Sequence, residues 1–376
     1  MADIPLSRPY VSGRELALVT EALQSRRWSG DGEQTRRAAQ LLAARTGGGT
    51  AMLTTSCTHA LELAALLLDL VPGDEVIVPA FTFVTTASAF ALRGARPVFV
   101  DIRPDTLNLD ERLLPAAITA RTRAIVPVHY GGVACAMDAI GEVARAAGAT
   151  VIEDNAHGLF GTWRGRPLGS LGRLATQSFH ESKNLSCGEG GALILNDPAL
   201  VERAEILREK GTNRARFFRG EIDRYTWVDL GSSYLPSELL AAVLVAQLEA
   251  ADTIQAARHR IWATYATELA SWAHRHGIGL PTVPADCVHP AHLFYLVLPD
   301  LERRTRMLAH LRARGIHATF HYQPLHLSEV GRRWGGAPGD LPVTERIADT
   351  LLRLPLYPDL DARDLGRVLD AVTEFR

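Results

Sequence analysis

Cysteine is scarce in this chain, and neither sign of charge dominates. The four cysteines, Cys57, Cys135, Cys187 and Cys287, are widely separated. This excludes a disulfide-rich scaffold, and no pair has the spacing of a zinc site, so we expect no bound metal. Lysine and arginine number 40 against 42 aspartates and glutamates, which gives a formal net charge of −2. A chain with this balance has no electrostatic reason to bind nucleic acid or an anionic membrane.

Long hydrophobic runs are also absent. The longest apolar stretch without a charge, residues 76–92, contains a proline and several hydroxyl residues. It is too short to span a bilayer comfortably. The first ten residues, MADIPLSRPY, lack the basic and apolar segments of a secretory signal. We therefore expect a soluble cytoplasmic protein.

The sequence does contain short apolar runs that alternate with longer amphipathic ones. Its 376 residues, 47% of them hydrophobic, suffice for two domains. Buried strands are predicted at residues 75–79, 97–101, 124–129, 150–154, 175–179 and 191–196. Helices are predicted at residues 12–26, 56–70, 82–92, 111–120 and 137–147. This alternation is typical of an α/β protein with a mainly parallel sheet that is covered by helices on both faces.

The last third of the chain has a different pattern. A long helix is predicted from just after Pro236 to about His274. It is followed by a strand at 292–298, a helix at 302–315, a short strand at 317–321 and two C-terminal helices. These elements indicate a smaller α+β domain. We place the large domain, with its N-terminal helical segment, at residues 1–240 and the small domain at residues 241–376.

Ligands of open parallel sheets bind beyond the carboxyl ends of the strands, and three features of the sequence lie there. Residues 54–60, TTSCTHA, lead from a strand into a helix and offer backbone N–H groups and hydroxyls to a phosphate. Asp154 ends an apolar strand, and a buried carboxylate needs a cation such as a protonated ring nitrogen. Lys183 follows a strand beside hydroxyl residues and a glycine-rich turn, which makes it a candidate Schiff-base nucleophile.

Each of these features has an ordinary structural explanation when it is taken alone. Serine, threonine and aspartate are common helix N-caps. His157, three residues after Asp154, could be a structural histidine, and a lysine in a loop usually lies on the surface. The combination is what indicates function, because pyridoxal phosphate requires an anion site, an acid for its pyridine nitrogen and an amine for its aldehyde. We therefore predict pyridoxal 5'-phosphate as the cofactor.

The chain resembles the DegT/StrS-type sugar-nucleotide aminotransferases, which are pyridoxal-phosphate enzymes of the aspartate-aminotransferase (type I) fold. The motifs that carry the resemblance are TSCT at 55–58, PAFTF at 79–83, VPVHY at 126–130, ED at 153–154, SFHESKN at 178–184, GEGG at 188–191 and HYQPLH at 321–326. The segments that look most like the dTDP-4-dehydro-6-deoxyglucose 4-aminotransferases are RPDT at 103–106, REKGTN at 208–213, FFRG at 217–220 and YTW at 225–227.

The resemblance implies roles for individual residues. Lys183 is the catalytic residue and forms the Schiff base with the cofactor, while Asp154 pairs with the pyridine nitrogen. Phe83 stacks on the cofactor ring, and His157 contacts its phenolic oxygen. The implied contacts to the phosphate are Cys57, Thr58, Ser178 and, in the neighbouring subunit, Ser233. Many relatives have an asparagine at this last position, and the serine has a shorter reach.

The resemblance also implies a reaction and partners. L-Glutamate is the amino donor in a ping-pong reaction with the C4 ketone of dTDP-4-dehydro-6-deoxy-D-glucose, which yields a dTDP-4-amino-4,6-dideoxyhexose. The enzyme is a homodimer whose active sites are built from both subunits. Because arginine pairs with diphosphates and aromatic rings stack on sugars or thymine, Arg219 and Tyr225 are candidate substrate contacts. His321 and Tyr322 are the next candidates.

Three alternatives remain open at this point. The substrate could be a different keto-sugar nucleotide. The protein could be a pyridoxamine-phosphate-dependent deoxysugar dehydratase, although such relatives usually have a histidine in place of the Schiff-base lysine, so Lys183 favours transamination. It could also be a cofactor-binding regulatory protein without turnover, although the sequence has no DNA-binding appendage or basic segment. The sequence leaves open whether the product amine is axial or equatorial.

Overall fold

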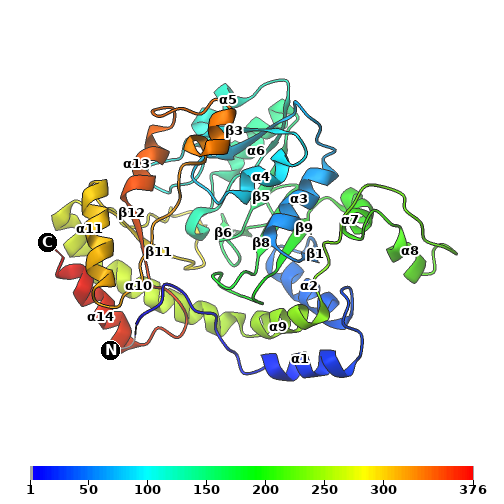
Figure 1. Ribbon diagram of the computed structural model, residues 1–376, viewed down its shortest axis with the longest axis horizontal. Helices are drawn as coiled ribbons and strands as arrows, with labels where there is room; N and C mark the ends of the chain where they lie inside the picture. The colour runs from blue at the N-terminus through cyan, green and yellow to red at the C-terminus, as the bar shows by residue number, and fades with distance from the viewer. Residues whose placement is uncertain (1–2, 376) are drawn as a thin grey trace.

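The computed structural model describes residues 3–375, and a seven-stranded sheet is its central element (Figure 1). The strand order is β1-β9-β8-β5-β4-β2-β3. Of these seven, β9 alone runs against its neighbours, since it pairs antiparallel with β1 and β8 while the strands from β8 to β3 pair in parallel. The carboxyl ends of the other six strands therefore lie at one edge of the sheet. The strands are β1 (Thr50–Thr54), β2 (Glu75–Pro79), β3 (Arg96–Val100), β4 (Thr122–Ile125), β5 (Thr150–Asp154), β8 (Leu174–Ser178) and β9 (Gly191–Leu195).

Helices cover both faces of this sheet. Alternate side chains of a strand point to opposite sides, and in these strands both sets include apolar residues that need to be covered. Val76 and Val78 pack with α3, α4 and α7, whereas Ile77 packs with α6 on the opposite face. The β9 end of that second face is covered by α1, α2 and α9. The predicted α/β fold with a mainly parallel sheet is confirmed. The helices are α1 (Glu15–Gln24), α2 (Glu33–Arg45), α3 (Cys57–Leu67), α4 (Thr85–Ala91), α5 (Leu114–Ala117), α6 (Met137–Ala147), α7 (Val201–Arg208), α8 (Arg214–Phe218), α9 (Glu238–Glu249), α10 (Ala251–His276), α11 (Leu301–Arg312), α12 (Glu329–Arg333), α13 (Pro342–Thr350) and α14 (Ala362–Thr373).

The long helix predicted after Pro236 is in fact two helices, α9 and α10, which are bent by 62° at their junction. Leu244 of α9 is buried against α1 and α2, whereas Ile261 and Tyr265 of α10 are buried in the core of the C-terminal unit. The chain bends where it passes from one core to the other. Among residues 3–375, no single helix is long and apolar enough to cross a membrane, and α9 and α10 meet that test only as a bent pair.

The C-terminal unit contains an antiparallel pair of strands, β11 (Phe294–Val297) and β12 (Leu351–Leu354), packed against α10, α11 and α14. Figure 1 shows this unit at one end of the molecule and α8 projecting at the other. Ile4 is fully buried in the same core, so the N-terminal segment crosses to this unit. The division at residue 240 stays a prediction.

Three local predictions are wrong or incomplete. The strand expected at 317–321 is reduced to a single bridge between Thr319 and Arg353. Its partner β12 was missed, because a four-residue run directly after a helix has no turn signal before it. The helix expected at 111–120 is a 3-10 turn followed by the short α5, because Ile118 is already extended. A small sheet that was not predicted is formed by β10 (Cys287–Val288), β6 (Thr162–Trp163) and β7 (Arg166–Pro167).

Candidate active site

The carboxyl ends of the sheet strands open onto a cavity of about 640 Å³. Asp154 ends β5, Ser178 ends β8, and Thr54 at the end of β1 leads into α3. The wall opposite the sheet comes from residues 319–323 and from β12 of the C-terminal unit. Nine of the predicted site residues line this cavity: Cys57, Thr58, Phe83, Asp154, His157, Ser178, Lys183, His321 and Tyr322.

The amino terminus of α3 has the character of an anion site. Ser56 caps the helix by accepting a hydrogen bond from the N–H of His59 (3.1 Å). Cys57 and Thr58, in the first turn, line the cavity. Their N–H groups have no acceptor within the helix, because the first N–H groups of a helix lack an intrahelical partner. Burial raises the pKa of the Cys57 thiol to about 12, so this side chain is neutral. Backbone N–H groups and a neutral thiol at a helix amino terminus suit a phosphate.

A glycine allows this helix start to approach the sheet. Gly191, the first residue of β9, packs directly against the backbone between Ser56 and Cys57. A Cβ atom added at Gly191 would lie only 2.3 Å from the carbonyl carbon of Ser56. The anion site is therefore held in place by a close backbone contact that any side chain would disrupt.

Asp154 supplies a buried carboxylate to the cavity, since only 4% of the residue is exposed. Its Oδ2 accepts a hydrogen bond from the hydroxyl of Thr86 (2.7 Å), and its Oδ1 accepts one from the N–H of Ala156 (3.2 Å). Both partners are neutral. A cationic ring nitrogen in the cavity would supply the opposite charge that a buried carboxylate requires.

Glu153, the neighbour of Asp154, points to the other side of β5 and has a structural role. It is fully buried and accepts hydrogen bonds from the N–H groups of Gly169 (2.9 Å), Leu171 (2.7 Å) and Gly172 (2.7 Å). The ring Nε2 of His129 lies 3.0 Å from the same carboxylate. Glu153 thus ties the loop at 169–172 to the strand that carries Asp154.

Lys183 lies in the loop after β8, and its N–H donates to the carbonyl of His180 (2.9 Å). Burial lowers the pKa of Lys183 to about 8, with Cys57 and Asp154 opposing this shift and Arg353 adding to it. A lysine with this pKa has a substantial neutral fraction near pH 8, and the neutral amine is the form that acts as a nucleophile or a base.

Phe83 and His157 present an aromatic face and a neutral imidazole to the cavity. The Phe83 residue is 57% exposed, which is unusual for a large apolar side chain and leaves its ring free to stack on a ligand. Burial lowers the pKa of His157 well below its ordinary value. Its Nδ1 accepts a hydrogen bond from the N–H of Gly131 (3.3 Å), so its Nε2 carries the hydrogen and faces the hydroxyl of Tyr322 (3.4 Å).

The C-terminal unit contributes His321, Tyr322 and a residue that the sequence analysis missed, Arg353. The guanidinium of Arg353 donates to Nε2 of His321 (2.5 Å), whose Nδ1 lies 3.3 Å from the hydroxyl of Tyr130. Arg353 is the one charged residue in the apolar run LLRLPL at 351–356. A lone arginine inside such a run is the signal that could have identified it. His292 was missed as well, and it stacks on His157 at 4.2 Å between ring centroids.

The cavity fits pyridoxal phosphate on the chemistry of its donors. It contains a helix amino terminus for the phosphate, a buried carboxylate for the ring nitrogen, an exposed aromatic face for the ring and a lysine of lowered pKa for the aldehyde. Within residues 3–375, no cluster of histidine, cysteine, aspartate and glutamate side chains is placed to hold a metal ion.

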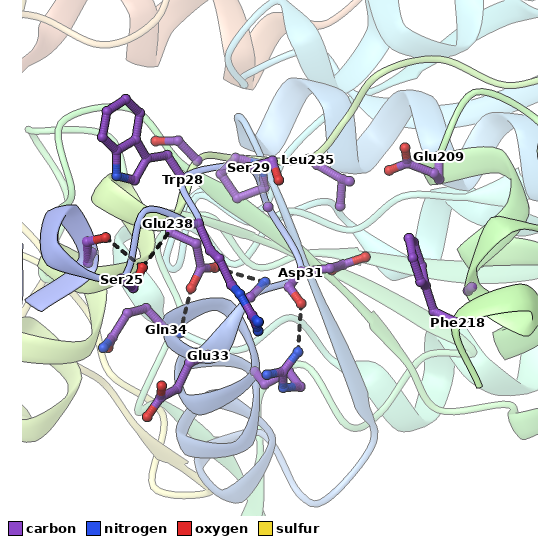
Figure 2. Close-up of a pocket in the computed structure, with 18 of the residues that line it drawn as sticks. Ser25, Trp28, Ser29, Asp31, Glu33, Gln34, Glu209, Phe218, Leu235 and Glu238 are labelled. Atoms are coloured by element: carbon purple, nitrogen blue, oxygen red, sulfur yellow. Dashed lines mark hydrogen bonds between the residues drawn. The ribbon is translucent and has the colours of Figure 1, made fainter. Parts of the chain in front are cut away.

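Three predicted residues lie outside this cavity. Ser233 lines a second, more polar cavity of about 1030 Å³ between the loop at 28–33 and the segment that contains α8. Figure 2 shows Phe218 and Glu209 on one side of it and Trp28 on the other. Arg219 forms ion pairs with Glu205 and Glu221, and the exposed Tyr225 ring packs on Phe217.

Several charged groups in the walls of the second cavity are paired with neighbouring residues. Glu238 accepts a hydrogen bond from the N–H of Gln34 (2.7 Å) (Figure 2). It accepts another from the N–H of Thr35 (3.0 Å). The guanidinium of Arg208 pairs with the carboxylate of Asp31 at 2.6 Å. Neither Lys183 nor Asp154 lines this cavity, so the chemistry belongs to the smaller one.

The fold and the smaller cavity together define a pyridoxal-phosphate-dependent aminotransferase. A family model matches residues 9–373 of the chain. The protein belongs to the DegT/DnrJ/EryC1/StrS aminotransferase family.

Several relatives are similar over their full lengths. The spore coat polysaccharide biosynthesis protein SpsC of Bacillus subtilis is 34% identical over 99% of this chain and 97% of its own. The crystal structure of DesV from S. venezuelae has a TM-score of 0.90 and 34% identity, with 100% of this chain and 98% of that chain covered. Spr1654 of Streptococcus pneumoniae, solved in its PMP form, has a TM-score of 0.91 at 27% identity, with 99% of this chain and 98% of that chain covered.

Proposed function

We propose that the protein transfers an amino group from L-glutamate to the C4 ketone of dTDP-4-dehydro-6-deoxy-D-glucose and forms a dTDP-4-amino-4,6-dideoxyhexose. The observation that carries the transamination is the placement of Lys183, with a pKa of about 8, in one cavity with Asp154. A lysine at this position argues against the dehydratase alternative. The choice of sugar rests on the resemblance of the segments at 103–106, 208–213, 217–220 and 225–227.

Different residues of this chain have separate roles in the proposed reaction. When bound, pyridoxal phosphate supplies an aldehyde that takes up the amino group and an electron-withdrawing ring. Asp154 holds a proton at the ring nitrogen, which keeps the ring electron-poor. Lys183 Nζ, in its neutral form, takes a proton from Cα of the donor and returns a proton during the second half of the cycle. The amino terminus of α3 fixes the phosphate, and the C-terminal wall limits the access of water.

We also propose a homodimer in which the segment at 212–227 of one subunit contributes to the active site of the other. This proposal is supported by the exposure of its aromatic residues, with Phe218 67% and Trp227 73% exposed. Isolated chains rarely leave such residues uncovered. A dimer with shared active sites would also explain why Ser233, Arg219 and Tyr225 lie away from the cavity of their own chain.

The function is tested by incubation of the holoenzyme with L-glutamate and dTDP-4-dehydro-6-deoxy-D-glucose. We expect 2-oxoglutarate and one amino sugar nucleotide to form in equal amounts. NMR coupling constants at C4 of the product then distinguish an axial from an equatorial amine. If 2-oxoglutarate forms only with a different keto-sugar nucleotide, the proposed sugar substrate is wrong. Release of a dehydrated sugar would contradict transamination.

A further inference from the structure

Arg353 is a cation in the catalytic cavity without an acidic partner among the described residues. It extends from β12, where its backbone pairs with Tyr295 of β11 and bridges to Thr319. The side chain donates one hydrogen bond, to Nε2 of His321. Its Nε is buried and has no hydrogen-bond partner within residues 3–375. A guanidinium has five N–H donors, so most of the hydrogen-bonding capacity of Arg353 is unused.

The groups that face Arg353 cannot balance its charge. Burial lowers the pKa of His321, so the ring that accepts from the guanidinium is neutral. Tyr130 and Tyr322 also face it, and burial raises the pKa of both hydroxyls, so they stay neutral too. Lys183, with which Arg353 interacts electrostatically, is a second basic group and cannot neutralise the guanidinium.

The acidic residues of the cavity are engaged elsewhere. Asp154 is the proposed partner of the cofactor ring nitrogen. Glu189 is exposed, and its carboxylate lies 3.8 Å from Nε2 of His180. An unpaired guanidinium that has lost much of its hydration is costly, and an anionic ligand in the cavity would offset that cost.

Arg258, another buried arginine of the C-terminal unit, shows the contrast. It donates from Nε to the carbonyl of Ala291 (3.1 Å) and from Nη2 to the carbonyl of His292 (2.5 Å). Its role is therefore to hold the backbone beside the cavity. In the part of the chain that the structure describes, Arg353 has no carbonyl or carboxylate partner of this kind, and it lines the cavity itself.

We propose that Arg353 binds a carboxylate of the amino-acid donor. The donor must place its amine at Lys183 and carries carboxylates on the same small molecule. Arginine binds a carboxylate through two parallel N–H···O bonds, which would engage the donors that are unused in this chain. This inference rests on the proposed transamination but not on which sugar is the acceptor.

The test uses the holoenzyme and two variants of Arg353, with Arg346→Gln as a matched control. Arg346 is an exposed arginine of α13, seven residues earlier, and does not line the cavity. Arg353→Gln removes the charge, and Arg353→Lys keeps it without the bidentate geometry. The direct probe is glutarate, a dicarboxylate without an amine, whose binding is measured by calorimetry and needs no turnover.

We expect Arg353→Gln to weaken glutarate binding about 10- to 100-fold, with Arg353→Lys between this variant and the wild type. The apparent Kd for L-glutamate in its half-reaction, followed in the visible spectrum, should rise by a similar factor. The half-reaction with the dTDP-amino sugar should be affected less than the glutamate half-reaction, because this substrate carries no carboxylate. Arg346→Gln should match the wild type in all three measurements.

Two results would overturn the inference. Unchanged glutarate binding in Arg353→Gln would exclude a carboxylate site at this residue. A loss confined to the sugar-nucleotide half-reaction would assign the guanidinium to a phosphate or the sugar instead. A wrong choice of sugar substrate gives a different result. The wild type would then react with glutamate but not with the dTDP-amino sugar. The glutarate binding of the Arg353 variants could still be compared in that case.

Discussion

Lys183 meets two requirements that conflict, because it is withdrawn from water and must exchange a proton. We predict that Lys183→Ala abolishes turnover and leaves the fold intact, since no other lysine within residues 3–375 lines the cavity. Borohydride treatment of the wild-type holoenzyme should fix the cofactor to the peptide that contains Lys183. Circular dichroism of the variant provides the control for folding, and mass spectrometry that finds the label on a different lysine would contradict the assignment.

The lowered pKa of Lys183 also has a cost in stability. A lysine whose pKa is about 8 in the folded chain, against 10.5 when unperturbed, destabilises the fold while it is charged. The cost is fully present below pH 8 and disappears as the pH rises towards 10.5. We predict that the apoenzyme of Lys183→Met is more stable than the wild-type apoenzyme at pH 7, by up to about 3 kcal/mol. Denaturant unfolding should show that the difference in free energy of unfolding between the two apoenzymes is smaller at pH 10.5 than at pH 7. A difference independent of pH would contradict the prediction.

Asp154 is the second residue whose charge matters. Asp154→Asn keeps the size and one acceptor oxygen but removes the charge that retains the ring proton. We predict a loss of two or more orders of magnitude in kcat, which corresponds to about 3 kcal/mol or more of transition-state stabilisation. Steady-state kinetics at saturating concentrations of both substrates measure this loss. A variant with nearly normal kcat would mean that another group serves the ring nitrogen.

At the scale of elements, the contact between β9 and the start of α3 carries a prediction of its own. Gly191→Ala would place a Cβ atom against the backbone of Ser56 and push the helix start away from the cavity. We expect at least tenfold weaker binding of pyridoxal phosphate, about 1.4 kcal/mol, measured by titration of the apoenzyme. The control is Gly141→Ala in α6, where the added atom meets nothing within 4 Å. That variant should bind the cofactor normally and be equally or more stable.

The elements that the sequence predicted well are those whose signal is local. Asp154 could be placed at a strand end because it closes a short apolar run. The strand predicted at 175–179 ends one residue earlier, at Ser178, and Lys183 could be placed near the same edge because it follows this strand by a few residues. Arg353 could not be found in this way, because β12 pairs with β11, more than fifty residues earlier in the chain. The bend between α9 and α10 was missed for a similar reason. It depends on which core each helix joins, and both helices have continuous helical periodicity.

At the scale of the whole molecule, the segment at 212–227 is the part of the chain through which we expect the dimer to bind the sugar nucleotide. We predict that Arg219→Ala or Tyr225→Ala raises KM for the sugar nucleotide by roughly tenfold or more, about 1.4 kcal/mol. The glutamate half-reaction should be nearly unchanged, because glutamate lacks the diphosphate, sugar and thymine that Arg219 and Tyr225 are proposed to contact. Equal damage to both half-reactions would mean that the segment shapes the cofactor site or the fold.

A dimer with shared sites predicts complementation between inactive subunits. Lys183→Ala subunits co-refolded with subunits that carry both Arg219→Ala and Tyr225→Ala should regain up to about a quarter of wild-type activity at low sugar-nucleotide concentration. Each mixed dimer would contain one intact site, with Lys183 from one chain and the unmodified segment at 212–227 from the other. Mixed dimers that form, as shown by tagged subunits, but stay inactive would contradict a shared site.

The alternation of Glu153 and Asp154 along β5 has a consequence for how this chain can change in length. Neighbouring residues of a strand point to opposite sides, so a one-residue shift of β5 that moves Glu153 into the place of Asp154 would also turn Asp154 to the opposite face. The acid that faces the cavity would then be the one suited to three backbone N–H groups, and the loop at 169–172 would lose its anchor. Insertions and deletions can accumulate in the connections around β5, but within the strand a single codon gained or lost removes the cofactor's acid and the loop's anchor together.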